Sequence, residues 1–266
     1  MAHELEVIAR ECDGESSYPP LLFVHGSCHA AWCWDEHFLP YFAERGFDSY
    51  ALSLRGHGES SGPGSLRWTS IAAYVADVEA VAADLRAEPV VVGHSLGGLV
   101  VQKYLERHDS PGAVLVAPAP RRGRGRGALR LLWRAPALSA RLLLTMEPRT
   151  LFATPELCRR LLFSPATSDE VVDRCAERIG RESFRAWLEM LVLRLDARRI
   201  GSTPILILGA VGDRLISADA LRTTAGDYGA DLTMIPEMGH DMMLEGHWPK
   251  AAEAMHDWLL RTLTAA

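Results

Sequence analysis

Short apolar runs recur along the chain, and segments with helical spacing separate them. Each run is four to six residues long and rich in β-branched or aliphatic residues, which is typical of buried strands. The runs cover residues 21–24, 49–54, 89–92, 113–116, 204–208 and 231–235. Helical patterns cover 37–45, 69–86, 96–108 and 247–263, and Thr69 or Ser70 is a candidate N-cap for the second. This alternation predicts an α/β fold with a mostly parallel sheet and crossover helices.

The alternation stops after residue 117 and resumes at residue 204. Between them, an Arg-Gly-rich stretch at 121–127 leads into apolar residues with helical spacing, and a further helix is expected at 183–195. Residues 121–199 carry 17 Arg against 9 Asp and Glu, although the whole chain has a net charge of -6. We therefore predict a helical cap over residues 119–199, inserted into a core formed by residues 1–118 and 200–266.

Composition and charge narrow the classes of function. With 266 residues and 48% hydrophobic content, the chain can bury a full core. The net negative charge argues against nucleic-acid binding, and the Arg-Gly stretch is short, interior and free of aromatic residues. The charged first residues and the lack of a long apolar stretch predict a cytoplasmic protein without stable membrane insertion. We expect a monomer or homodimer. Five cysteines without a CxxC pair indicate neither a disulfide framework nor a metal site.

One motif stands where an apolar run meets a helical pattern, VVGHSLGG at residues 91–98. Gly93 and Gly97 flank Ser95 with one residue between each pair, which gives the spacing Gly-x-Ser-x-Gly. Small neighbours permit a sharp, strained turn that exposes the serine hydroxyl between a strand and a helix. The pattern predicts that Ser95 is a nucleophile.

A serine hydroxyl needs a base within hydrogen-bond reach and an acid that orients the base. Asp213 follows the apolar run PILILGA, and His240 lies in the loop MIPEMGHD after the last run. Both positions follow strand ends, where side chains of an open α/β sheet converge. We predict Asp213 as the orienting acid and His240 as the base. Asp241 adjoins the base, but neighbouring residues on an extended loop point in different directions, so Asp213 is preferred.

An oxyanion that forms on the substrate needs hydrogen-bond donors. They are usually the backbone N–H after the nucleophile and one from an early strand-to-helix loop. Leu96 supplies the first donor. In the early loop FVHGSCHAAW, His25 and Gly26 are expected to shape the turn, so the N–H of Ser27 is the natural second donor.

These motifs together make the chain similar to the α/β-hydrolase family. The resemblance extends over essentially the whole chain and rests on FVHGSCHAAW, LRGHGES, GHSLGG and the loops that contain Asp213 and His240. It implies an eight-stranded sheet, a helical cap over the active site and a catalytic triad of Ser95, Asp213 and His240. It also implies that His57, in LRGHGES, has a structural role.

The residue at the elbow separates branches of this family. An aspartate there would suggest dehalogenase or epoxide-hydrolase chemistry, whereas serine points to acyl transfer without a metal or an organic cofactor. The segment CHAAW also resembles plant methyl esterases and hydroxynitrile lyases. In the lyases a lysine follows the catalytic histidine and a threonine follows the first histidine of the early loop. Asp241 and Gly26 hold those positions here, which disfavours lyase chemistry.

The expected function is therefore hydrolysis of a carboxylic ester, with a small hydrophobic ester or acyl substrate. The apolar cap is consistent with a lipase or lysophospholipase, although the same residues could simply pack the cap onto the core. Candidate pocket residues, which could equally be core residues, are His25, Cys28, His94, Trp133, Met238 and Met242. Two alternatives remain open: carbon–carbon bond hydrolysis with the same triad, and a non-catalytic ligand-binding member of the fold.

Overall fold

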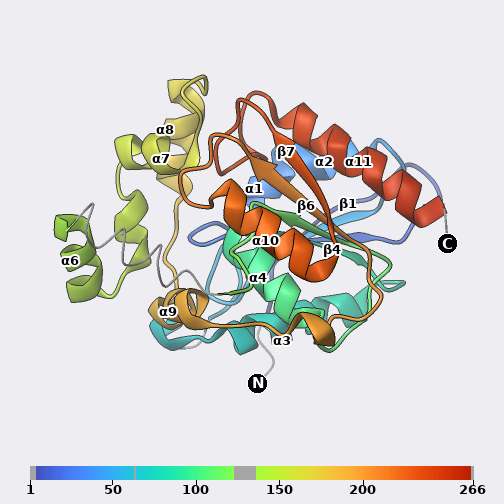
Figure 1. Cartoon of the computed structure of the whole chain (residues 1–266), viewed down its shortest axis with the longest axis horizontal. Helices are drawn as coiled ribbons and strands as arrows, with labels where there is room; N and C mark the ends of the chain where they lie inside the picture. The colour runs from blue at the N-terminus through green and yellow to red at the C-terminus, as the bar shows by residue number, and fades with distance from the viewer. Residues whose placement is uncertain (1–3, 63, 123–135, 265–266) are drawn as a thin grey trace.

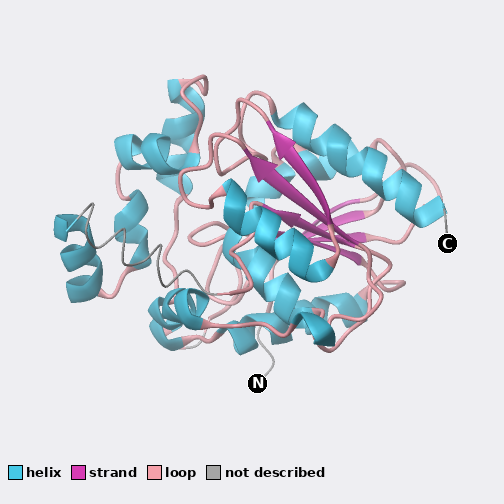
Figure 2. Ribbon diagram, viewed as in Figure 1, coloured by secondary structure: helices cyan, strands magenta, loops and turns pink. Residues whose placement is uncertain are grey.

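The computed structural model describes residues 4–62, 64–122 and 136–264, and its centre is a twisted β-sheet (Figure 2). Within this part of the chain the sheet has seven strands in the order β1-β3-β2-β4-β5-β6-β7. The strands are β1 (Val7–Arg10), β2 (Leu21–Val24), β3 (Ser49–Leu52), β4 (Val90–His94), β5 (Ala113–Val116), β6 (Ile205–Ala210) and β7 (Asp231–Ile235). All neighbours are parallel except β1, which runs antiparallel to β3. The mostly parallel α/β sheet is confirmed.

The expected number of eight strands is wrong for the described residues. Only β1 precedes β2, and it pairs with β3 at the edge of the sheet. Residues 11–20, which connect β1 to β2, are mostly polar and end in Pro19 and Pro20, which lack the N–H that a strand would donate. This segment therefore adds no further strand.

Helices cover both faces of the sheet (Figure 1). One face carries α1, α2 and α11, and the other carries α3, α4 and α10. The N-cap of α3 is Ser70, whose hydroxyl accepts from the N–H of Ala73. The helices are α1 (Trp32–Asp35), α2 (Phe38–Ala43), α3 (Ile71–Asp84), α4 (Ser95–Tyr104), α6 (Pro136–Thr145), α7 (Pro155–Leu162), α8 (Asp169–Arg178), α9 (Phe184–Val192), α10 (Ala218–Tyr228) and α11 (Trp248–Thr264). None of the helices in the described ranges combines the length and the apolar character needed to cross a bilayer.

The sheet separates two hydrophobic cores. Along β2, Leu21 and Phe23 pack into the core under α1, α2 and α11, whereas Leu22 and Val24 pack into the core under α3 and α4. Alternate side chains of a strand point to opposite faces, so both faces need apolar residues. Strands β2, β4, β5 and β6 are buried along their whole length, which explains why they are continuous apolar runs in the sequence.

Helices α6 to α9 lie between β5 and β6 and extend to one side of the sheet (Figure 1). The two ends of this insertion lie together. The N–H of Leu195 donates to the carbonyl of Arg121 at 3.0 Å, and the Arg121 guanidinium bonds Asp227 of α10 at 2.7 Å. The insertion therefore leaves and rejoins the core at one place, within the range predicted for the cap. The limits of the cap as a separate domain remain a prediction.

Candidate active site

The turn between β4 and α4 places Ser95 at the carboxyl end of the sheet. Ser95 has φ 51°, a left-handed value that is rare for a residue with a side chain. The neighbouring glycines allow the close packing around it. A Cβ on Gly93 would lie 2.5 Å from the carbonyl oxygen of Gly97, and a Cβ on Gly97 would lie 2.3 Å from that of His25. No larger residue fits at either position, as the predicted elbow requires.

The structure brings Asp213 and His240 together. Asp213 follows β6, and its Oδ2 lies 2.8 Å from Nδ1 of His240, which follows β7. The other oxygen of Asp213 accepts from the N–H groups of Leu215 and Ile216 at 2.7 and 2.9 Å. Both oxygens of Asp213 thus have hydrogen-bond partners, and the side chains of Asp213 and His240 are buried. This arrangement places a proton on Nδ1 of His240 and leaves Nε2 with its lone pair, the tautomer that a general base needs.

Ser95 is tied to His240 through the intervening His94. Nε2 of His94 donates to the carbonyl oxygen of His240 at 3.1 Å, and the two rings have centroids 4.7 Å apart. Burial, with the nearby His240, lowers the pKa of His94 to about 3, so this ring is neutral. The Ser95 hydroxyl itself makes no hydrogen bond with a described residue. Hydrogen bonds of catalytic groups often form only when substrate is bound.

The early loop packs directly against the nucleophile. A Cβ on Gly26 would lie 3.2 Å from Cβ of Ser95. The buried His25 shapes this loop, because its Nδ1 donates to the carbonyl of Gly26 at 2.8 Å and its Nε2 accepts from the N–H of Leu54 at 3.0 Å. Burial and the adjacent His57 lower the pKa of His25 well below its ordinary value. The neutral ring is therefore a structural part of the turn.

Two backbone N–H groups beside Ser95 have no hydrogen-bond partner among the described residues. One belongs to Leu96, in the first turn of α4, where a helix leaves its N–H groups unpaired and concentrates positive partial charge. The other belongs to Ser27, in the loop against Ser95. The sequence predicts these two N–H groups as oxyanion donors, and that role remains a prediction.

His29 and Asp241 form a buried ion pair behind this loop. Nε2 of His29 lies 3.0 Å from Oδ2 of Asp241, and Nδ1 lies 2.9 Å from the carbonyl oxygen of Ser27. Both ring nitrogens face acceptors, an arrangement in which the protonated ring can donate two hydrogen bonds. Burial lowers the pKa of His29, but the charge and hydrogen bond of Asp241 outweigh this and raise it. The Asp241 carboxylate thus pairs with His29 and not with the imidazole of His240.

Glu182, between α8 and α9, is a site residue that the sequence did not reveal. Its Oε2 accepts from the hydroxyl of Ser27 at 3.0 Å and from the N–H of Cys28 at 3.3 Å. Its Oε1 accepts from the hydroxyl of Tyr74 at 2.7 Å and from the N–H of Ser183 at 2.6 Å. The side chain is almost fully buried. A carboxylate from the insertion thus reaches the loop that carries a predicted oxyanion donor.

His57 completes the surroundings of Glu182. Its Nε2 lies 3.5 Å from Oε2 of Glu182, and its Nδ1 lies 3.2 Å from the carbonyl oxygen of Arg55. Burial lowers the pKa of His57, but the Glu182 carboxylate outweighs this and raises it. Burial in turn raises the pKa of Glu182, but the charge of His57 and the donated hydrogen bonds lower it to about 2. His57 therefore faces Glu182 and not the Asp213–His240 pair.

The candidate pocket residues are largely buried in the structure. Cys28, Met238 and Met242 are completely buried in the core that also contains α1, α2 and α11. Trp133 lies outside the described residues. Contact of these residues with a substrate therefore remains a prediction.

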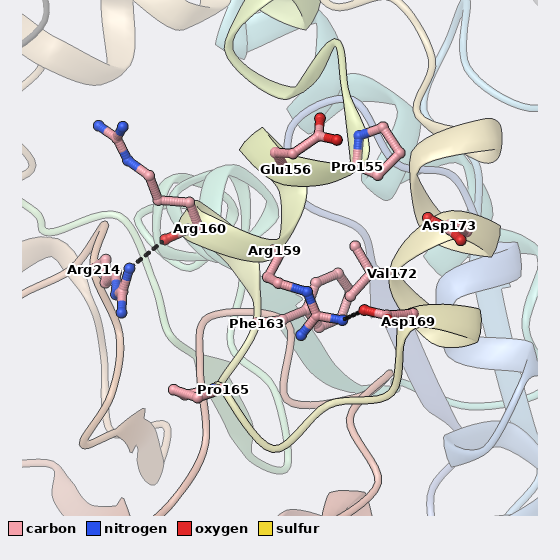
Figure 3. Close-up of a pocket in the computed structure, with 10 residues that line it drawn as sticks. All are labelled: Pro155, Glu156, Arg159, Arg160, Phe163, Pro165, Asp169, Val172, Asp173 and Arg214. Atoms are coloured by element: carbon pink, nitrogen blue, oxygen red, sulfur yellow. Dashed lines mark hydrogen bonds and ion pairs between the residues drawn. The ribbon is translucent and has the colours of Figure 1, made fainter.

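A cavity of about 560 Å³ lies between α7, α8 and the residue after Asp213 (Figure 3). It is lined by Pro155, Glu156, Arg159, Arg160, Phe163, Pro165, Asp169, Val172, Asp173 and Arg214. Arg159 pairs with Asp169 at its wall, and Arg214 donates to the carbonyl of Arg160. The cavity contains none of the residues that the sequence assigned to the pocket.

Within the described ranges, two buried groups of side chains have the composition of a metal site. They are His29, Cys175 and Asp241, and His94, His240 and Asp241. Their donor atoms lie within 4.8 Å of one another in each group. Hydrogen bonds already account for the arrangement of His29 with Asp241 and of His94 with the His240 carbonyl.

Curated proteins resemble part of this chain. Over 105 residues the chain is 37% identical to a non-heme haloperoxidase of Rhodococcus erythropolis, a match that covers 38% of this chain and 37% of that protein. Over 113 residues it is 32% identical to epoxide hydrolase A of Mycobacterium tuberculosis, covering 41% and 35%. The matches thus span little more than a third of the length of these curated relatives.

Solved structures share the fold over nearly the whole chain. A thermophilic esterase from Thermogutta terrifontis superposes with a TM-score of 0.72 at 20% identity, covering 98% of this chain and 94% of that one. A monoacylglycerol lipase of Paleococcus ferrophilus has a TM-score of 0.71 at 20% identity, covering 97% and 99%. The model of the alpha/beta hydrolase family matches residues 21–254. The chain therefore belongs to the alpha/beta hydrolase family.

Proposed function

We propose that this chain is a serine hydrolase that cleaves carboxylic esters through an acyl-enzyme on Ser95. The observation that carries the proposal is the buried Asp213–His240 pair, 2.8 Å apart, at the same edge of the sheet as the strained Ser95. A nucleophile, a base in the correct tautomer and an orienting acid are the groups that acyl transfer requires.

In the first half of the reaction, Ser95 Oγ attacks the ester carbonyl carbon and transfers its proton to Nε2 of His240. The N–H groups of Ser27 and Leu96 stabilise the negative charge on the carbonyl oxygen. When the tetrahedral intermediate collapses, the C–O bond to the alcohol breaks and His240 returns the proton to the leaving alkoxide. The alcohol departs and the acyl group remains on Ser95.

In the second half, water gives a proton to His240 and attacks the acyl carbon. The same two N–H groups stabilise the second oxyanion. Collapse breaks the bond to Ser95, whose oxygen recovers the proton, and the carboxylic acid departs. Asp213 stabilises the imidazolium that forms twice in the cycle.

The substrate class we propose is a small hydrophobic ester, in the manner of a carboxylesterase or lipase. The esterases and the monoacylglycerol lipase among the structural neighbours support this class, because they share the fold over nearly the whole chain. The similarity to an epoxide hydrolase does not extend the proposal to epoxides, because Ser95 stands where that chemistry uses an aspartate.

The test is hydrolysis of p-nitrophenyl esters from acetate to palmitate by the parent chain, Ser95→Ala and Ser17→Ala. Ser17 is exposed on the segment before β2, at the opposite end of that strand from the early loop, and serves as the matched control. We expect Ser95→Ala to lose turnover and Ser17→Ala to retain it. Equal turnover in the parent and Ser95→Ala would exclude Ser95 as the nucleophile. A parent that cleaves a carbon–carbon bond of a diketone, or binds a ligand, but hydrolyses no ester would refute the proposal.

A further inference from the structure

The loop that carries Ser27 is held from two sides, by the core and by the insertion. On the core side, His29 donates to the carbonyl of Ser27 at 2.9 Å and His25 donates to that of Gly26 at 2.8 Å. On the insertion side, Glu182 accepts from the Ser27 hydroxyl and from the N–H of Cys28. Among the residues that the structure describes, every polar group of Ser27 therefore has a hydrogen-bond partner except its N–H.

The backbone of Cys28 shows how strongly the insertion holds this loop. Cys28 has φ 65°, a left-handed value that is strained for a residue with a side chain. Both of its peptide groups bond the insertion, because its N–H donates to Glu182 and its carbonyl accepts from the N–H of Gly180 at 2.8 Å. Such a conformation persists only where its surroundings fix it. Here the segment from Gly180 to Glu182 supplies part of that constraint.

Peptide geometry connects these hydrogen bonds to the stabilisation of the oxyanion. The carbonyl of Gly26 and the N–H of Ser27 belong to one planar peptide and point in opposite directions. The bonds on either side of this peptide fix its rotation, and rotation decides where the free N–H is aimed. An oxyanion donor is effective only within about 2.7–3.1 Å of the developing charge. Small movements of Ser27 therefore change stabilisation of the transition state more than binding of the ester.

We propose that Glu182 is a positioning residue for the loop from Gly26 to Cys28, which we call the oxyanion loop. By holding this loop in its reactive shape, the insertion completes the active site as well as flanking it. The inference rests on the proposed function, because it assigns the Ser27 N–H to the oxyanion. Glu182 touches neither the nucleophile nor the base. It acts through Ser27 and Cys28.

The experiment compares Glu182→Gln with Glu189→Gln in the full chain. Gln has the same shape as Glu, but its NH₂ end cannot accept. It therefore loses either the bonds to Ser27 and Cys28 or the bonds to Tyr74 and Ser183 that hold the side chain beside this loop, and both losses loosen the loop. Glu189 also joins the insertion to the core, since it accepts from the N–H of Ile71 at 2.7 Å, but it does not touch the loop. Each variant removes one carboxylate that bonds the insertion to the core, but Glu182→Gln alone changes a residue that contacts the oxyanion loop.

We expect Glu182→Gln to lower kcat by about tenfold to a hundredfold with little change in KM, since complete loss of one oxyanion donor costs roughly 10²–10³. Affinity for a trifluoromethyl ketone, which forms a tetrahedral adduct on the serine, should fall by a similar factor. Glu189→Gln should match the parent in both measurements. Equal kcat and equal ketone affinity in the two variants would overturn the inference, as would a loss confined to KM.

Two further measurements cover the remaining outcomes. If thermal unfolding shows that Glu182→Gln does not fold, Ser27→Ala is measured in its place. This variant removes the hydroxyl bond to Glu182 and keeps the backbone N–H of residue 27. A parental kcat in Ser27→Ala overturns the inference. If the parent hydrolyses no ester, the proposed function fails, and labelling of Ser95 by a fluorophosphonate tests Glu182 separately. Labelling slower in Glu182→Gln than in Glu189→Gln supports the inference, whereas equal rates or no labelling overturn it.

Discussion

Substitution of Gly97 by alanine tests whether the packing of α4 against β2 sets the geometry of the site. An added Cβ would lie 2.3 Å from the carbonyl oxygen of His25 and 2.5 Å from that of Val24. Ordinary contacts of this kind begin at about 3.4 Å, so α4 and β2 must separate by roughly 1 Å. Both obstacles are backbone atoms, so no side-chain rotation can relieve the clash.

The cost follows from this displacement. Overpacking of a well-packed interior costs about 1–3 kcal/mol, and the higher helix propensity of alanine returns less than about 1 kcal/mol. The expected net loss is about 1–2 kcal/mol, which for a chain of this size lowers Tm by roughly 2–4 °C per kcal/mol. Activity should fall further, because His25 leads directly into the oxyanion loop. A misplacement of about 1 Å can cost about a hundredfold in rate.

Gly226→Ala is the matched control. Gly226 is exposed in α10, and a Cβ there would have no atom within 4 Å. This variant should gain about 0.5–1 kcal/mol from helix propensity and keep parental kcat. Thermal unfolding and p-nitrophenyl ester hydrolysis measure both quantities in the three proteins. Gly97→Ala with a raised Tm and parental kcat would refute the packing argument.

Two other predictions concern the charged groups of the site. Asp213→Asn can still accept from Leu215 and Ile216, but its NH₂ would face Nδ1 of His240 and force the tautomer that cannot act as base. We expect kcat to fall by up to about 10⁴-fold with little change in Tm. A loss of kcat below tenfold would contradict the role assigned to Asp213. His29 has a raised pKa in the folded state, so its pair with Asp241 adds stability that is fully present below the unfolded value of about 6.5 and is lost as pH rises through the folded pKa. The lowered pKa of Asp241 keeps its charge down to pH values below about 3.8. Urea unfolding from pH 5 to 9 should therefore show the largest stability difference between the parent and His29→Gln at pH 5–6, and a difference that grows with pH would contradict the ion pair.

The parts of the fold that sequence predicted best are those with a strong local signal. The fully buried strands β2, β4, β5 and β6 are continuous apolar runs, and each lies where a run was predicted. The edge strand β1 was missed because it is mostly exposed and its apolar run is only three residues long, between Glu6 and Arg10. Helix α10 was also missed, since its exposed face is polar and its apolar residues are few.

The candidate site also contains residues with a clear sequence signal and one residue without it. The proximity of Asp213 and His240 followed from their positions after successive strands, because parallel strands end at one edge of the sheet. Glu182 had no comparable signal. It lies 155 residues from Ser27 in the sequence, within a segment rich in charges that are mostly exposed. Its role depends on how the insertion folds back over the core, which local patterns do not encode.

The residue after the predicted base is a second carboxylate with a different partner. It is Asp241, whose side chain is fully buried and paired with His29. His29 in turn donates to the carbonyl of Ser27, so Asp241 is connected to the loop that carries Ser27. On the other side of this loop, Glu182 accepts from the Ser27 hydroxyl and has His57 as its neighbour. Two buried carboxylates thus support one loop from opposite sides, and neither contacts Ser95. The carboxylate that bonds the imidazole of His240 is that of Asp213, which leaves one acid to orient the predicted base and two to support the loop.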